Sequence, residues 1–278
     1  MPLATTAELV DQARAAGRGL AAFNVITLEH ANAVVRAAER AALPVVLQVS
    51  ENAVRFHGRP EPLLEGSTAV ARGASVPVSL HLDHVESPDL LRSAIASRAV
   101  SSVMFDASRL PYGENVRATA EAVRLAHRSG VWLEAELGEV GGKDGPHAPG
   151  VRTDPVEAAG YVAETGVDAL AVAVGSSHAM TERTASLDHE LICRLAAAVH
   201  VPLVLHGSSG VPDQELRRAV GAGMVKINIG TALNIAFTSA VRRVLADQPS
   251  LVDPRRYLAP AREEMSTAAA RLLAVLAP

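Results

Sequence analysis

Short, largely apolar segments alternate with longer amphipathic segments along almost the whole of this 278-residue sequence. Most of the short segments are apolar throughout, which is typical of parallel strands that are buried on both faces. Eight candidate strands can be identified, at residues 20–25, 44–50, 77–84, 102–108, 132–138, 169–176, 202–209 and 226–231. Eight strand–helix units in a chain of this length predict an α/β fold, a single (β/α)8 TIM barrel domain spanning residues 1–278. A doubly wound parallel sheet is the alternative.

Helix signals between the candidate strands agree with this order. In the segment 153–166, Thr153 or Asp154 can cap a helix, Pro155 fits its first turn and Gly166 can end it. Other helical patterns lie at residues 28–41, 114–130 and 213–223 and, after the last strand, at 232–247 and 260–276. We therefore expect a barrel followed by extra C-terminal helices.

Charge and composition exclude several classes of protein. A net charge of −4 argues against nucleic-acid binding, because phosphate backbones require clustered cations. No apolar run reaches the roughly 20 residues of a membrane span, and the N-terminal residues lack the pattern of a secretory signal. The single cysteine, Cys193, allows no internal disulfide and fits a reducing compartment. We therefore expect a cytoplasmic protein that binds neither nucleic acid nor membrane.

Polar side chains follow the apolar part of every candidate strand. In a (β/α)8 barrel these strand ends meet at one face, where such barrels carry their chemistry. A turn or a satisfied buried group could explain any one of them, but not their recurrence after all eight strands. The residues are Asn24, Ser50, Asp83, His84, Asp106, Glu136, His178, His206 and Asn228.

Three histidines among these strand-end residues predict a zinc site. His84, His178 and His206 follow the third, sixth and seventh candidate strands. Three neutral imidazoles from separate strands can form an open catalytic zinc site with a fourth position for water or substrate. In a regular strand His84 would point away from Asp83, so we expect it to turn inward only at the strand's end. His81 lies one layer deeper, where a supporting hydrogen bond is the expected role.

Glycine-containing turns after the last two strands predict an anion site. The sequences HGSSG (206–210) and NIGT (228–231) each precede a helical pattern. Backbone N–H groups at helix N-termini bind phosphate, and barrels commonly hold phosphate after strands seven and eight. The longest connection, residues 138–153, is rich in glycine and carries charges, so it is either disordered or a lid.

Taken together, these motifs resemble the class II, metal-dependent aldolases that act on dihydroxyacetone phosphate, in particular the class IIB fructose-bisphosphate and tagatose-bisphosphate aldolases. The resemblance covers nearly the whole chain. The segments that carry it are AFNV, HLDH, EAELGEVGG, TDPVEAAGYVAETGVDALAVAVGSSH, PLVLHGSSG, KINIGT and DPRRYLAPARE.

The resemblance implies roles for the matching residues. His84, His178 and His206 match the zinc ligands, and Asp106 and Glu136 match acidic residues that can hold the metal in an alternative position. Asp83 matches the aspartate that exchanges a proton with an oxygen of the aldehyde half. The substrate-binding positions are Asn24, Ser50, Ala179, Arg183, Gly207, Ser208, Ser209, Asn228, Ile229, Gly230 and Thr231. The family also uses a monovalent cation, Na⁺ or K⁺, beside the ketone phosphate.

Several positions depart from the family pattern. The loop reads GGKDG, so Asp144 stands where the family usually has the glutamate that moves the proton at the ketone carbon. Ala179 replaces a common glycine, and Arg183 stands near the place of a common basic residue. Gly230 replaces an acidic or amide residue. These changes leave the expected metal chemistry intact and bear on the identity of the substrate.

The resemblance implies a zinc-dependent aldolase that reversibly cleaves a ketose phosphate, such as fructose 1,6-bisphosphate, to dihydroxyacetone phosphate and an aldehyde. Asp83 and Asp144 are the expected acid–base residues, and a homodimer or homotetramer is the expected assembly. Two alternatives remain open: an aldolase for a different, non-glycolytic ketose phosphate, and a non-catalytic barrel that acts as an assembly partner.

Overall fold

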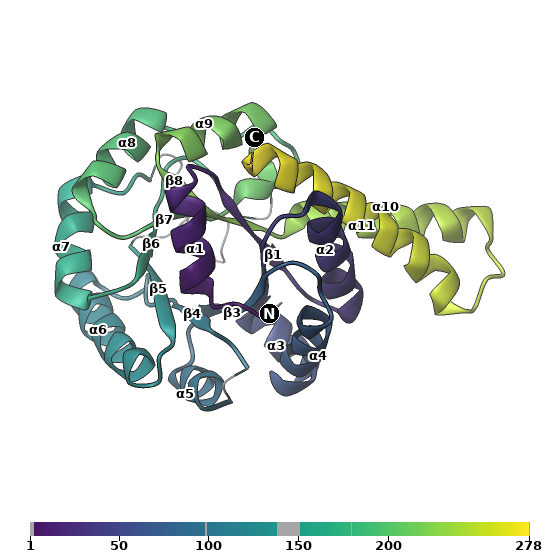
Figure 1. Cartoon of the computed structure of the whole chain (residues 1–278), viewed down its shortest axis with the longest axis horizontal. Helices are drawn as coiled ribbons and strands as arrows, with labels where there is room; N and C mark the ends of the chain where they lie inside the picture. The colour runs from purple at the N-terminus through teal and green to yellow at the C-terminus, as the bar shows by residue number, and fades with distance from the viewer. Residues whose placement is uncertain (1–2, 98, 138–150, 179, 278) are drawn as a thin grey trace.

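The computed structural model describes residues 3–97, 99–137, 151–178 and 180–277. In this part of the chain eight parallel strands form a closed barrel in sequence order, and β1 pairs with β8 to complete it (Figure 1). This confirms the predicted (β/α)8 barrel and excludes the doubly wound sheet. The strands are β1 Leu20–Asn24, β2 Val45–Ser50, β3 Val78–Val85, β4 Ser102–Phe105, β5 Trp132–Glu136, β6 Ala169–Ala171, β7 Leu203–Leu205 and β8 Met224–Ile229.

Helices surround the barrel, and the main apolar core lies between them and the outer faces of the strands. Valine, leucine and alanine recur at these buried positions, which explains why the strand sequences read as apolar. The helices are α1 Thr6–Ala15, α2 Leu28–Ala41, α3 Glu51–His57, α4 Glu61–Arg72, α5 Pro88–Ser97, α6 Tyr112–Arg128, α7 Pro155–Thr165, α8 His189–Ala198, α9 Asp213–Ala222, α10 Thr231–Asp247 and α11 Pro254–Leu276.

Helix α1 covers the N-terminal end of the barrel (Figure 1). Its residues Leu9 and Val10 pack in a small apolar cluster with Leu20 of β1 and Val46 of β2. Thr5 and Glu8 form a capping box that fixes the start of the helix. Because α1 covers this end, the open end of the barrel is the opposite one, where the strands have their C-terminal ends and the polar side chains gather.

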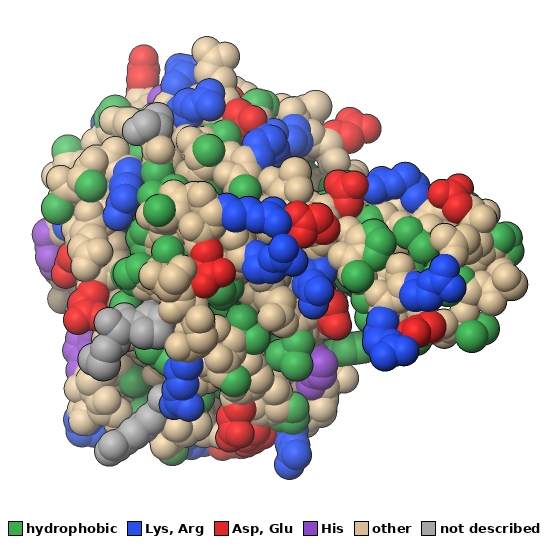
Figure 2. All heavy atoms as spheres, turned by 45° about the vertical axis from the view of Figure 1, so that its right-hand side comes forward, with side chains coloured by type: hydrophobic (Ala, Val, Ile, Leu, Met, Phe, Trp, Pro, Cys, Tyr) green, Lys and Arg blue, Asp and Glu red, His purple; other side chains and the backbone are tan. Residues whose placement is uncertain are grey.

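The two C-terminal helices that the sequence predicted are present as α10 and α11, and they form an arm that projects from the barrel (Figure 1). The expected start of this last helix, at Pro260, was wrong. Helix α11 begins at Pro254, and Pro260 lies inside it. Figure 2 shows hydrophobic side chains on this arm among charged ones, and Ile235, Leu245 and Val252 are exposed there. Within the described residues, no helix combines the length and apolar character needed to cross a membrane.

Candidate active site

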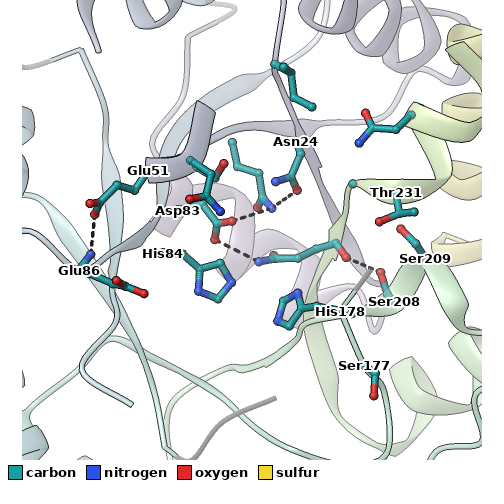
Figure 3. A pocket seen from close by; sticks show the side chains of 18 of the residues that line it. Asn24, Glu51, Asp83, His84, Glu86, Ser177, His178, Ser208, Ser209 and Thr231 are labelled. Carbon is teal, nitrogen blue, oxygen red and sulfur yellow. Dashed lines mark hydrogen bonds between the residues drawn. The ribbon is translucent and has the colours of Figure 1, made fainter. Parts of the chain in front are cut away.

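A cavity of about 410 Å³ opens at the C-terminal ends of the strands. Side chains and backbone from all but two of the strand ends reach it, so barrel closure brings distant sequence positions together. Figure 3 shows His84 and His178 in the middle, Ser209 and Thr231 on one side and Glu51 and Glu86 on the other. The cavity is lined by Asn24, Ile26, Gln48, Ser50, Glu51, Asn52, Arg55, Asp83, His84, Glu86, Arg109, Ser177, His178, Gly207, Ser208, Ser209, Asn228, Gly230, Thr231 and Asn234.

An irregularity at the end of β3 brings His84 beside Asp83. The pairing register between β3 and β4 shifts between Leu82 and Val85. His84 has a φ of 51°, in the left-handed region that residues other than glycine seldom adopt. Because consecutive side chains of a regular strand point to opposite faces, this break in the pattern lets both Asp83 and His84 line the cavity. The expected inward turn of His84 is therefore present.

The three strand-end histidines converge in this cavity region. His84 lies near the end of β3, His178 in the loop after β6, and His206 directly after β7. Their ring centroids are separated by 5.2 Å for His84–His178, 4.8 Å for His84–His206 and 5.7 Å for His178–His206. One nitrogen of each ring lies within 4.8 Å of the others, so the three could bind one metal ion.

A second group with metal-binding geometry shares His84. Nδ1 of His84 lies 2.9 Å from Oδ2 of Asp106, which follows β4, and 3.9 Å from Oε2 of Glu136 at the end of β5. Ligand atoms of these three residues also lie within 4.8 Å of one another. The first group offers three nitrogen ligands and the second offers mainly oxygen ligands. Because both groups include His84, an ion could occupy either of two neighbouring positions.

His206 shows how these residues fit a metal. Its Nε2 lies 3.0 Å from Oε1 of Glu134, while its buried Nδ1 has no hydrogen-bond partner among the described residues. Burial alone would lower the pKa of His206, but the hydrogen bond to Glu134 and the nearby Glu136 carboxylate outweigh it and raise that pKa to about 9. The carboxylates that favour a proton on this ring also favour a metal cation in its place at Nδ1, so the donor set fits the metal that the sequence predicts.

Asp83 is held as a carboxylate at the base of the cavity. Its Oδ1 accepts a hydrogen bond from Nδ2 of Asn228 at 3.4 Å, and its Oδ2 accepts one from Nε2 of Gln48 at 3.5 Å. Burial alone would raise the pKa of Asp83, but electrostatic attraction to His84 and Lys226 outweighs it and keeps that pKa below its ordinary value. Asp83 can therefore accept a proton from a group bound in the cavity.

The turns after β7 and β8 form one wall of the cavity. Gly207 has a φ of 66°, and a Cβ there would lie 2.5 Å from the backbone of Ser177, so the turn requires glycine. The hydroxyl of Ser209 accepts a hydrogen bond from the backbone N–H of Ala232 at 3.1 Å, joining this turn to the first turn of α10. Gly230 and Thr231 line the cavity at the N-terminus of α10, where backbone N–H groups favour an anion.

A cluster of charged residues lies across the cavity from the wall formed by the turns after β7 and β8 (Figure 3). Oε2 of Glu51 accepts hydrogen bonds from the backbone N–H groups of Glu86 at 2.7 Å and Ser87 at 3.1 Å, which ties α3 to the loop after β3. Arg55 contacts Oε1 of Glu51 at 2.6 Å. Arg55 and Arg109 both approach the Glu86 carboxylate, at 3.9 and 4.0 Å. Both guanidinium groups thus line the cavity mouth.

Not every expected site residue reaches the cavity. Arg183 donates to the carbonyl of Val211 and to Asp213 and is absent from the lining, so its observed contacts are structural. Ile229 is buried in β8 and does not line the cavity either. The expected metal-site residues Asp106, Glu136 and His206 are buried too and are likewise absent from the lining. Asp144 and Ala179 lie outside the described residues, as does most of the expected lid.

Sequence reasoning missed several residues of the site. Arg55 and Arg109 come from α3 and from the loop after β4, and their approach to Glu86 is a tertiary contact. Glu134 and Lys226 gave a usable signal, because each precedes an expected site residue, Glu136 or Asn228, by two positions of a strand. Residues two apart in a strand share a face, so this spacing could have placed both side chains in the barrel interior.

Comparisons with known proteins agree with this geometry. The family described as "Fructose-bisphosphate aldolase class-II" matches residues 4–277. The chain is 40% identical over 267 residues to the "Probable fructose-bisphosphate aldolase" of Bacillus subtilis (strain 168), covering 95% of this chain and 93% of that protein. It is 39% identical to the "Fructose-bisphosphate aldolase" of Geobacillus stearothermophilus, with the same coverage. The crystal structure of the YdjI aldolase from Escherichia coli K12 superposes with a TM-score of 0.85 at 34% identity, covering 99% of this chain and 97% of that one.

Proposed function

Because the chain belongs to the class II fructose-bisphosphate aldolase family and is thus a carbon–carbon lyase, we propose that it is a zinc-dependent enzyme of one barrel domain. Its proposed reaction is the reversible cleavage of a ketose bisphosphate, such as fructose 1,6-bisphosphate, to dihydroxyacetone phosphate and an aldehyde. The observation that carries this proposal is the convergence of three histidines, two of which line one cavity with Asp83, between an anion-binding wall and a mouth that carries two arginines and two glutamates.

His84, His178 and His206 are the proposed zinc ligands, and Asp106 and Glu136 would hold the ion in an alternative position with His84. Zinc supplies a Lewis acid that draws electron density from a ketone oxygen, which favours breaking the neighbouring C–C bond. The proposed role of the protein is to orient the imidazoles and to keep the Asp106 and Glu136 carboxylates close to them.

Asp83 is the proposed acid–base group for the aldehyde half. In cleavage it would take the proton of the hydroxyl that becomes the aldehyde oxygen, and in condensation it would return that proton. The amides of Asn228 and Gln48 orient its carboxylate, and its lowered pKa keeps it ionised. Asp144 is proposed, from the sequence alone, as the group that moves the proton at the ketone carbon.

The wall formed after β7 and β8 is the proposed site of the ketone phosphate. The turns at Gly207 and Gly230 line this part of the cavity together with Ser208, Ser209 and Thr231, and backbone N–H groups and hydroxyls of such turns suit a phosphate. Asn24 and Ser50 are proposed to contact the sugar between this phosphate and the mouth. A monovalent cation, Na⁺ or K⁺, is proposed beside the phosphate.

Arg55 and Arg109 support a second anionic group at the far end of the substrate. Both approach Glu86, and Arg55 also contacts Glu51. Glu51 and Glu86 lie across His84 and His178 from Ser209 and Thr231 (Figure 3). Guanidinium groups suit phosphate or carboxylate, and their contacts of 3.9 and 4.0 Å to Glu86 are too long for strong hydrogen bonds. A ketose that carries phosphate at both ends matches this arrangement.

A non-glycolytic ketose phosphate is the second candidate, and Glu86 favours it. The Glu86 carboxylate lies between the two arginines and offsets part of their charge. A distal group with hydroxyls, or with one negative charge, would meet less repulsion there than a phosphate dianion.

A retro-aldol screen tests the proposal. Ketose mono- and bisphosphates and a sugar acid phosphate would be supplied to the zinc-loaded enzyme, with and without a chelator. We expect cleavage that the chelator abolishes and that Zn²⁺ or Co²⁺ restores. Full cleavage by a metal-free preparation would refute the zinc proposal, and preference for a monophosphate would favour the second candidate.

Variants at the mouth separate substrate recognition from the chemistry. Arg55→Ala and Arg109→Ala should raise KM for a bisphosphate on the order of tenfold or more, as expected for loss of a charge-assisted hydrogen bond. Proton exchange at the ketone carbon of dihydroxyacetone phosphate should stay near the wild-type rate, because that half binds at the opposite wall. Arg72→Ala, at the end of α4 and outside the cavity lining, is the matched control.

Cytoplasmic location and a homodimer or homotetramer are also proposed. The single cysteine of the sequence supports a reducing compartment. Exposed apolar residues on the α10–α11 arm support contact with a second copy. The molar mass in solution, measured by light scattering, tests the assembly, since a value near 29.0 kDa would contradict it.

A further inference from the structure

Lys226 is fully buried in β8, and the proposed reaction gives it no direct part. Its Nζ lies 2.8 Å from Oε2 of Glu134 and 2.7 Å from Oδ1 of Asn228. Because β5 and β8 are not neighbouring strands, the contact between Lys226 and Glu134 crosses the interior of the barrel. A buried ammonium is costly even when it is paired, and an apolar side chain of similar volume is often as stable. The pair therefore calls for a role other than stability.

We propose that Lys226 is a positioning residue that holds two groups of the active site, His206 through Glu134 and Asp83 through Asn228. The proposal rests on the functions proposed above for His206 and Asp83. Its main test uses metal ions alone, so it can succeed or fail independently of which ketose the enzyme cleaves.

The first connection fixes the orientation of His206. The ammonium of Lys226 favours the carboxylate form of Glu134, and a carboxylate can only accept hydrogen bonds. Nε2 of His206, at 3.0 Å from Glu134, must therefore carry the hydrogen. Nδ1, which lies 3.6 Å from Oε2 of Glu136, is then the nitrogen that could bind a metal together with the other two histidines. A carboxylate behind a histidine in this way orients the ring and raises its basicity toward a metal.

The second connection fixes the orientation of the Asn228 side chain. An ammonium can only donate, so the oxygen of the Asn228 amide faces Lys226 at 2.7 Å. Its Nδ2 is consequently the end that donates to Oδ1 of Asp83 at 3.4 Å. Without the ammonium the amide could rotate and present its oxygen to the Asp83 carboxylate, which would repel it.

Lys226→Met tests the first connection, because methionine keeps an unbranched side chain and removes the charge. Glu134 then becomes an uncompensated buried carboxylate and loses its hold on His206. We expect the affinity for Zn²⁺ to fall roughly 10- to 100-fold, as for loss of other groups that orient a metal-ligating histidine. Competition with a chelator measures this affinity in the absence of substrate. The visible spectrum of the Co²⁺-loaded protein should change as well, because it reports ligand geometry.

A double variant separates positioning from simple stability. Glu134→Gln with Lys226→Met removes both buried charges together, so its unfolding temperature should recover relative to Lys226→Met. Its Zn²⁺ affinity should stay low, because a neutral amide is a weaker acceptor than a carboxylate for the Nε2 hydrogen. Leu64→Ala, in the buried face of α4 and outside the cavity lining, controls for destabilisation. It should lower the unfolding temperature and leave the Zn²⁺ affinity unchanged.

The second connection is tested by kinetics at saturating Zn²⁺. Lys226→Met should still cleave a ketose bisphosphate with kcat lowered roughly tenfold and KM within about twofold, because the donor to Asp83 is lost. A wild-type kcat under these conditions would overturn the connection through Asn228.

The connection through Glu134 would be overturned by either of two results. One is a Zn²⁺ affinity of Lys226→Met within about twofold of the wild type. The other is a double variant that recovers affinity together with stability. If Lys226→Met does not fold, the double variant carries the test on the same terms.

Discussion

At the scale of single residues, the backbone conformation of His84 allows two consecutive side chains at the end of β3 to line the cavity. A positive φ in a residue other than glycine costs on the order of 1 kcal/mol or more, so the surroundings must favour it. The contact of its Nδ1 with Asp106 at 2.9 Å is one such compensation. Asp83 and His84 can thereby serve the same cavity although they are adjacent in the sequence.

Asp83 offers the most direct test of the proposed chemistry at this scale. Asp83→Asn preserves shape and removes the base, and Asp83→Ala removes the group. Both should retain zinc and lower kcat for C–C cleavage by on the order of 10²-fold or more, as for other positioned acid–base groups. Zinc content by elemental analysis and steady-state rates measure the two effects. Turnover near the wild-type rate would assign the proton transfer to another group.

The sequence predicted the site best where one residue type recurs at strand ends. His84, His178 and His206 could be grouped because barrel closure fixes where strand ends lie. Arg55 and Arg109 could not be grouped in this way, since only the folded connections after β2 and β4 bring them to Glu86. The contact of Lys226 with Glu134 was equally hidden, because it joins strands that are not neighbours.

At the scale of elements, α11 shows the limit of local signals. The helical pattern at residues 260–276 predicted a start at Pro260, but Asp253 and Pro254 supply the actual cap and first turn. Pro260 is tolerated in the interior because it is exposed. The carbonyl of Arg256, which loses its helical partner there, lies on an exposed residue and can be hydrated.

Replacing Pro260 should therefore stabilise the arm. Pro260→Ala restores one helical hydrogen bond, and the free energy of unfolding should rise by roughly 1–3 kcal/mol, less than the full helix-propensity difference because proline also restricts the unfolded chain. Pro254→Ala is the matched control, since proline costs little at the first helical position, and its change should stay within about 0.5 kcal/mol. Urea unfolding of both variants makes the comparison. Equal effects of the two substitutions would contradict the assigned interior position of Pro260.

At the scale of the whole molecule, the alternation of strands and helices was sufficient to predict the closed barrel. Right-handed crossovers and buried parallel strands leave few other arrangements for eight such units. The N-terminal helix α1 was missed because its segment lies outside the strand–helix alternation, although the capping box of Thr5 and Glu8 is a signal that the sequence carries. Its Thr6 nevertheless donates a hydrogen bond to Ser79 inside the barrel at 3.2 Å, which joins the closed end to the polar interior.

That polar interior makes the stability of the whole molecule depend on pH. Burial lowers the pKa of His81 from 6.5 to about 3, with a further contribution from the charge of Lys226. Burial also lowers the pKa of His30 on α2. Between about pH 3 and 6.5 the unfolded chain therefore binds more protons at His81 than the folded chain does, and His30 acts in the same direction. Their contribution is present above pH 6.5 and is lost as the pH falls.

Urea unfolding between pH 7.5 and 5, with chelator present so that metal release does not contribute, measures this effect. His81 alone should add a slope that approaches about 1.4 kcal/mol per pH unit well below pH 6.5. His81→Gln should show a correspondingly flatter decline than the wild type, and this difference isolates His81 from the carboxylates and from His206. His200→Gln, at an exposed position, should keep the wild-type slope. Equal slopes for His81→Gln and the wild type would mean that His81 takes up its proton in the folded barrel, beside Asp83 and Glu134, as readily as in the unfolded chain.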